Sequence, residues 1–180
     1  FLSYLIAGKI SDASTPAQHV LDLDPTDELA RLTLGAVALK QRRYASAEQI
    51  LGRVSDGTLI GVTGGIMRAW AQVGAGDVDG AFATMDSVGA GGFDEFLVFH
   101  RAVMADVGTR REEALRLARE AYEADRFVAR IAEAYIRVLG NAGRFEEAAE
   151  VLGELEAEGI NHPILVDLGS AIEQQRRPGL

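Results

Sequence analysis

The chain of 180 residues contains no cysteine. This absence excludes disulfide bonds, thiolate nucleophiles and cysteine-ligated metals. Proline is scarce as well, with four residues, and no low-complexity tract interrupts the sequence. Because nearly half of the residues are hydrophobic (48%), the composition favours a folded chain over a disordered one.

Long hydrophobic runs are also missing. The longest uncharged run, 57–67, has 11 residues, whereas a membrane-spanning helix needs roughly 20, so no membrane span is expected. Basic residues never occur in runs longer than two, and the formal net charge is −9. Binding to phosphate needs clustered Lys and Arg, so no nucleic-acid partner is expected. The Ala, Gly and Arg usage suggests a bacterial source, and it leaves the compartment open between cytoplasm and periplasm or envelope.

An internal repeat organises what is present. Alanines recur at intervals of 34, 34, 33 and 34 residues, and these frame alanines are Ala13, Ala47, Ala81, Ala114 and Ala148. The register that they set is called the repeat frame below. A period in this range is typical of stacked helical hairpins, in which each unit buries its apolar face against its neighbours.

Other residue classes keep the same frame. Four residues after the frame alanines stand Ala17, Leu51, Met85, Ala118 and Leu152. Five residues before them stand Gly8, Arg42, Gly76, Thr109 and Gly143. A small residue where two helices cross, a large apolar residue one turn away and a glycine at the bend are what a helical hairpin requires.

Two segments carry most of this pattern: "LTLGAVALKQRRYASAEQILGRV" within 26–56 and "AEAYIRVLGNAGRFEEAAEVLGEL" within 127–158. With the 34-residue period, they make the chain resemble the tetratricopeptide repeat family over nearly its whole length. It also looks like the N-terminal part of the longer tetratricopeptide proteins of alphaproteobacteria. The resemblance implies an all-α fold, a right-handed α-solenoid of about five stacked hairpins over 1–180. The expected units are 1–25 (truncated), 26–59, 60–92, 93–126 and 127–160, followed by a C-terminal helix at 163–176.

The middle units depart from the pattern. Thirteen residues before the frame alanine, where two other units have Leu34 and Tyr135, they carry Arg68 and Arg101. Either these helices are rotated so that the arginines face solvent, or each arginine is paired at an interhelix contact. Rotation is favoured, because an apolar stripe at helical spacing persists in Ile66, Ala69, Trp70 and Val73.

The two ends are irregular. "TPAQ" at 15–18 predicts a helix that begins late, with Thr15 as its cap and Pro16 in its first turn. At the other end, a helix is predicted to begin at Pro163. It is interpreted either as a capping helix or as the first half of a sixth unit.

The stretch "VGAGDVDGA" at 73–81 raises the question of a ligand loop. A dinucleotide loop needs a preceding strand, and a Walker loop needs Gly-Lys-Ser/Thr. A calcium loop that starts at Asp77 needs a glutamate eleven residues later, and that residue is Val88. In the repeat frame, Gly76 stands where Gly143 stands in the last unit, so the stretch is interpreted as a bend between two helices.

Other catalytic or metal-binding chemistry finds no support. The histidines His19, His100 and His162 fall in different units, and none has a second ligand at zinc-like spacing. No Ser/His/Asp grouping is evident. The sequence therefore predicts no catalytic residue, no metal and no cofactor.

The resemblance implies that the first helix of each hairpin lines a concave groove. An exposed apolar surface is a binding surface, since large apolar patches rarely stay uncovered. For Trp70 and Phe99 a place in the core is favoured over the groove, and both alternatives stay open. The predicted lining residues are Leu32, Leu39, Ile66, Trp70, Val73, Phe96, Phe99, Val103, Arg130, Arg137 and Asn141.

Three functions are consistent with this architecture. The first is a non-catalytic scaffold or adaptor that holds a peptide or a partner helix in the groove. The second is a small-molecule or lipid carrier with an apolar pocket between hairpins in the glycine-rich middle units. The third is a structural segment of a larger chain or of a homo-oligomer.

Overall fold

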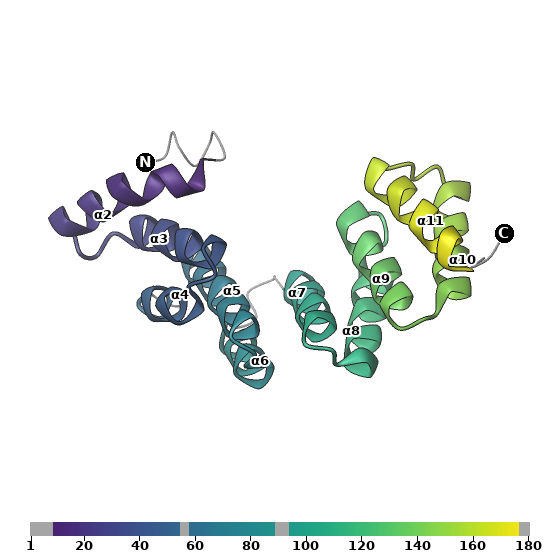
Figure 1. Ribbon diagram of the computed structural model, residues 1–180, viewed down its shortest axis with the longest axis horizontal. Coiled ribbons are helices and arrows are strands. Elements are labelled where there is room, and N and C mark those ends of the chain that lie inside the picture. Colours follow the sequence, from purple (N-terminus) through teal and green to yellow (C-terminus); the bar gives the residue numbers. More distant parts are fainter. Residues whose placement is uncertain (1–8, 55–57, 89–93, 177–180) are drawn as a thin grey trace. The chain divides into compact units, whose positions relative to one another are not determined.

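The computed structural model describes residues 9–54, 58–88 and 94–176 (Figure 1). The described residues form ten α-helices and one 3-10 turn, and they contain no strand. The all-α class predicted from the sequence is therefore confirmed. The chain divides into two compact units, Phe1–Ala90 and Gly91–Leu180, and each has its own core.

Unit 1 is built from two helical hairpins preceded by one short helix. Helix α3 packs against α4, α5 packs against α6, and α3 and α4 both pack against α5. Helix α2 and the preceding 3-10 turn η1 pack on α3. The bounds are η1 Ile10–Ala13, α2 Ser14–Leu23, α3 Glu28–Lys40, α4 Tyr44–Leu51, α5 Leu59–Gly74 and α6 Val78–Ser87.

Unit 2 has two hairpins and a final single helix. Helix α7 packs against α8, α9 packs against α10, and the first helices α7 and α9 also pack against each other. The last helix, α11, packs on both α9 and α10. The bounds are α7 Asp94–Val107, α8 Arg111–Ala124, α9 Ala129–Asn141, α10 Phe145–Ala157 and α11 Pro163–Arg176.

The frame alanines lie in the interior of the two units. All five have a relative exposure of 0%. In the second helix of each hairpin, the backbone N–H of the frame alanine donates to the carbonyl oxygen of the residue four positions earlier. This bond begins the helix, as from Ala47 to Arg43 (2.9 Å) and from Ala148 to Arg144 (3.0 Å). The prediction of small buried residues at a fixed spacing is therefore confirmed.

The bends repeat as closely as the alanines. The residues five before the frame alanines, Arg42, Gly76, Thr109 and Gly143, have positive φ values of 56°, 89°, 60° and 77°. In each case the next residue donates its N–H back across the helix end, as Asp77 does to Gln72 (2.9 Å). This is the Schellman ending, which needs a left-handed residue after the helix. The interpretation of 73–81 as a bend is confirmed, and Gly8 lies outside the described residues.

Exchanging residues between two of these bends should shift stability in opposite directions. Thr109 is β-branched and lies in the left-handed region, which costs an L-residue about 1–2 kcal/mol. We expect Thr109→Gly to raise the free energy of unfolding by about 1 kcal/mol, and Gly143→Thr to lower it by about 1–2 kcal/mol. Urea denaturation measures both. A loss of stability in Thr109→Gly would show that the threonine side chain makes a compensating contact.

The first described helix begins earlier than predicted. Helix α2 starts at Ser14, and its cap residue is Ala13, which offers no side-chain hydrogen bond. The assignment of Thr15 as the cap was wrong, because the turn η1 leads directly into α2 and aligns the first backbone groups instead. Pro16 is the third helical residue, where its missing N–H leaves no intrahelical bond unmade. Helix α11 begins at Pro163 as predicted.

The contacts of Arg68 bear on the two alternatives that the sequence left open for this residue, exposure to solvent or pairing at an interhelix contact. Its Nη2 lies 3.8 Å from Oε1 of Glu48 on α4, so it is paired at an interhelix contact and does not simply face solvent. The alternative of pairing at an interhelix contact therefore applies to Arg68, whose side chain is also 40% exposed. The same carboxylate accepts a 2.9 Å hydrogen bond from Gln72 Nε2, and Gln72 in turn accepts from Thr84 Oγ1 on α6 (2.8 Å). This polar chain, in which Gln72 and Thr84 are buried and Glu48 is partly exposed, ties α4, α5 and α6 together.

Candidate binding surface

In unit 1, most of the predicted lining residues belong to the core. Leu32, Ile66 and Val73 are at most 8% exposed. Leu39 is half-buried and packs against the cluster of Leu32 and its neighbours. Trp70 is also half-buried. These side chains stabilise the hairpins and leave little apolar surface for a partner.

In unit 2, the predicted lining residues are more accessible. Phe96 is 50% exposed, Phe99 and Val103 are half-buried, and Arg130 and Asn141 are exposed. The side chain of Arg137 is 38% exposed. A 2.9 Å hydrogen bond from Asn141 Nδ2 to Asp106 Oδ2 joins α9 to α7 directly. We call this surface the α7–α9 face, formed by Phe96, Phe99, Val103, Arg130, Arg137 and Asn141.

Two arginines of the α7–α9 face share one carboxylate. Glu133 Oε2 lies 3.1 Å from Arg130 Nη1, and Glu133 Oε1 lies 2.8 Å from Arg137 Nη1. The side chain of Glu133 is only 10% exposed, whereas that of Arg130 is 65% exposed. The carboxylate thus lies beneath and the guanidinium groups lie above it. We call these three residues the arginine cluster; it carries a net charge of +1, and each guanidinium keeps further N–H donors for a ligand.

The α7 half of this face is apolar and aromatic. The ring of His100 packs edge-on against Phe96, with centroids 4.5 Å apart, and against Phe99 at 5.1 Å. Burial lowers the pKa of His100 below its ordinary value, because desolvation disfavours the imidazolium. The imidazole is therefore neutral at pH 7, and it extends the apolar half of the face.

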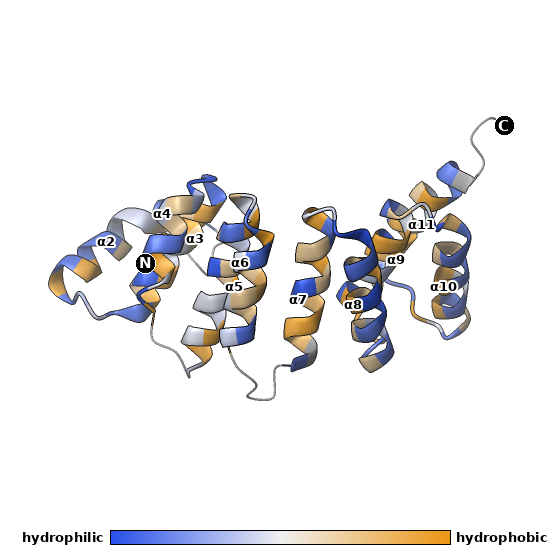
Figure 2. Ribbon diagram, turned by 90° about the horizontal axis from the view of Figure 1, so that it is seen from below, coloured by the Kyte–Doolittle hydropathy of each residue, from blue (hydrophilic) through white to orange (hydrophobic). Residues whose placement is uncertain are grey.

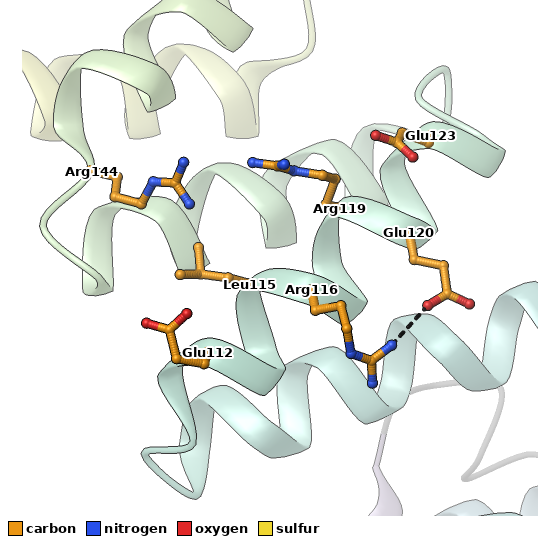
Figure 3. A pocket seen from close by; sticks show the side chains of 7 residues that line it. All are labelled: Glu112, Leu115, Arg116, Arg119, Glu120, Glu123 and Arg144. Atoms are coloured by element: carbon orange, nitrogen blue, oxygen red, sulfur yellow. Dashed lines mark hydrogen bonds and ion pairs between the residues drawn. The ribbon is translucent and has the colours of Figure 1, made fainter.

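A second, charged surface lies on the neighbouring helix. Figure 2 shows α8 as mainly hydrophilic, whereas α7 is largely hydrophobic. A hollow of about 400 Å³ is lined by α8 residues and by Arg144, which precedes α10. In Figure 3, Arg119 and Arg144 point toward each other across this hollow. The α8 residues that line it are Glu112, Leu115, Arg116, Arg119, Glu120 and Glu123.

The arginines of this hollow are engaged in structural contacts. Arg119 donates to Glu147 of α10 (2.9 Å) and to the hydroxyl oxygen of Tyr135 on α9 (3.2 Å). Tyr135 donates to the same carboxylate (3.2 Å), and Arg144 also pairs with Glu147. Burial raises the pKa of Tyr135 above its ordinary value, so the hydroxyl keeps its proton. The network joins α8, α9 and α10, and we assign it to hairpin packing.

The glycines of α5 do not open a pocket where they lie. A Cβ atom added at Gly65 would collide with Val88, and one added at Gly74 would collide with the ring of Tyr44. At Gly64 it would lie 3.1 Å from Val54. Neighbouring side chains therefore fill the space beside these glycines, which permits the close approach of α4 and α6 to α5.

Comparison of the sequence with protein-family models and with curated proteins gives no match. Among the described residues, no helix has both the length and the apolar character needed to cross a bilayer. No group of three or more His, Asp or Glu side chains suited to a metal ion is found in that part of the chain. The tetratricopeptide resemblance accordingly rests on the repeat frame alone.

Proposed function

We propose that the chain is a non-catalytic, tetratricopeptide-like binding module that holds a segment of another protein on its α7–α9 face. The hairpins would stack as a right-handed solenoid, with first helices on the concave side. Support comes from the buried frame alanines, from the four equivalent bends and from the packing of first helix on first helix in α7 and α9.

The α7–α9 face carries the proposal because it combines exposed apolar area with ordered charge. Phe96 and Val103 offer contacts for an apolar side chain. The arginine cluster offers donors that Glu133 already holds in place. Ordering the donors in advance reduces the entropy lost on binding. A segment with an apolar anchor and a nearby carboxylate would therefore fit this face best.

Site-specific photo-crosslinking tests this function. A benzoylphenylalanine placed at Val103 reports on the α7–α9 face, and one placed at Leu115 reports on the α8 hollow. Each variant is irradiated in a lysate of the source organism, and mass spectrometry maps the attached peptides. We expect one protein to cross-link at Val103 through a single segment, and not at Leu115.

Two results would contradict the proposal. One is a Val103 variant that stays folded by circular dichroism and yields no cross-linked protein. The other is equal capture of the same protein at Leu115. As a further control, Arg130→Ala should reduce the Val103 cross-link, because it removes an exposed donor without uncovering Glu133, which Arg137 still contacts.

A further inference from the structure

One side of α7 carries a row of accessible apolar side chains, which we call the apolar column. Phe96 and Val107 are 50% and 59% exposed, and Phe99 and Val103, which lie between them, are half-buried. Their spacing of three, four and four residues places all four side chains on the same side of the helix. The column extends about 16 Å from Phe96 to Val107, because a helix rises about 1.5 Å per residue. It can therefore contact about three turns of another helix.

The repeat frame matches the apolar column of α7 with a polar column on α9. The residues that stand 34 positions after its four members are Arg130, Glu133, Arg137 and Asn141. Helix α7 packs on α9, and the hydrogen bond from Asn141 to Asp106, the neighbour of Val107, joins the equivalent ends of the two columns. A segment that lies along both helices therefore meets apolar side chains on one flank and charged or polar side chains on the other.

This face offers few partners for the backbone of a bound segment. An extended segment has N–H and C=O groups at nearly every residue, and covering them without hydrogen bonds costs free energy. The phenylalanine and valine side chains of the apolar column provide no acceptor, and arginine provides donors only. The carboxylates of Glu133 and Asp106 already accept hydrogen bonds from side chains of α9. A helix satisfies its own backbone groups internally, so the face favours a helical segment over an extended one.

The arginine cluster determines where acidic side chains must lie on such a helix. Arg130 and Arg137 contact the two oxygens of the same Glu133 carboxylate, although they stand seven residues apart on α9. Their guanidinium groups therefore lie close together, nearer to each other than their backbone positions are. Side chains three or four positions apart on a helix have Cβ atoms about 5–6 Å apart, and this spacing suits two neighbouring guanidinium groups. A spacing of seven residues, about 10 Å along the helix, would reach beyond them.

We propose that the α7–α9 face binds an amphipathic helix of its partner, in which two acidic residues three or four positions apart flank an apolar stripe. The stripe packs along the apolar column from Phe96 to Val107, and the acidic residues pair with Arg130 and Arg137. This inference rests on the proposed function of the α7–α9 face. It adds the conformation of the bound segment and the spacing of its charges.

Selection from two peptide libraries on the intact 180-residue chain tests the conformation. One library displays a randomised face on a helix of a stable two-helix scaffold, and the other displays linear peptides in which regularly placed prolines prevent a helix. We expect helical binders that Val107→Glu weakens about tenfold, because the substitution places a charge against their apolar stripe. Val166→Glu on α11 is the matched control, since the two valines are 59% and 57% exposed, and it should change nothing. Circular dichroism checks that both variants stay folded.

Moving one acidic residue of a selected helix tests the charge spacing. A change of the spacing from four positions to seven should weaken binding about tenfold, and it should have little effect on binding to the Arg137→Ala variant. Helical binders that lack the acidic pair would overturn the charge spacing. Binders that respond to Val107→Glu and come from the proline library alone would overturn the helical conformation and leave the proposed function intact. If neither library yields a binder that responds to Val107→Glu, the inference and the proposed function both fail.

Discussion

Replacing Gly35 with alanine should destabilise unit 1 by about 1–3 kcal/mol, the usual cost of overpacking a core. Gly35 lies on α3, and a Cβ atom added there would stand 2.6 Å from Cγ of Leu51 and closer still to one of its methyl groups. Leu51 is 2% exposed, so it has no free space into which to move. The gain in helix propensity from glycine to alanine, about 1 kcal/mol, does not offset this collision.

The matched control is the same substitution in an open helix position. Gly153→Ala on α10 should raise the free energy of unfolding by about 0.5–1 kcal/mol, because the added Cβ meets nothing and only the propensity changes. Urea denaturation followed by circular dichroism measures both variants. If the two substitutions shift stability equally and in the same direction, the close crossing of α3 and α4 is not what requires glycine at 35.

The repeat frame also suggests a second substitution that should restore part of the lost stability. The positions of Gly35 and Leu51 are filled by Ala69 and Met85 in the next hairpin, and both of these are buried. Methionine is more flexible than leucine and adapts to a crowded site. Leu51→Met should therefore recover part of the stability lost in Gly35→Ala, and the coupling free energy of the double-mutant cycle should favour the pair.

The periodic features of the fold could be predicted from the sequence. Steric limits at a helix crossing allow only small residues, so the frame alanines recur visibly and all prove buried. The bends were predicted by the same frame, even at Arg42 and Thr109, where the residue type alone gives no indication of a left-handed backbone. Position in the repeat carried this information, because tertiary packing fixes the bend whatever residue occupies it.

The side-chain networks could not be predicted in the same way. Arg119, Tyr135 and Glu147 lie on three helices, and their contacts depend on how the hairpins stack, which no local spacing encodes. The residues that line a groove were difficult to predict for a related reason. Leu32 and Ile66 are apolar and at helical spacing whether they face a groove or the core, and here they face the core. The polar residues predicted to line the groove on α9 were a better guide to accessible surface than the apolar ones, because Arg130 and Asn141 are exposed.

Inverting the arginine cluster should abolish most binding at the α7–α9 face while preserving the helix. The variant combines Arg130→Glu, Glu133→Lys and Arg137→Glu. The i,i+3 and i,i+4 pairings of opposite charges are retained, so the helix keeps its local support. The lysine stem at 133 stays against apolar surface while its ammonium group reaches solvent. The net charge of the cluster changes from +1 to −1.

The affinity for the segment that cross-links at Val103 should fall about 100-fold, or about 2.7 kcal/mol. The loss should shrink at high salt, because exposed charges are screened. Exchanging Arg116 and Glu120 on α8, an exposed i,i+4 pair of 3.2 Å, leaves the net charge unchanged and should leave the affinity unchanged. Replacing the segment's acidic residue with lysine should restore binding to the variant with the inverted cluster, and not to the unaltered chain. If the original segment binds the unaltered chain and the inverted variant with equal affinity, the apolar half of the face, Phe96 to Val103, determines recognition by itself.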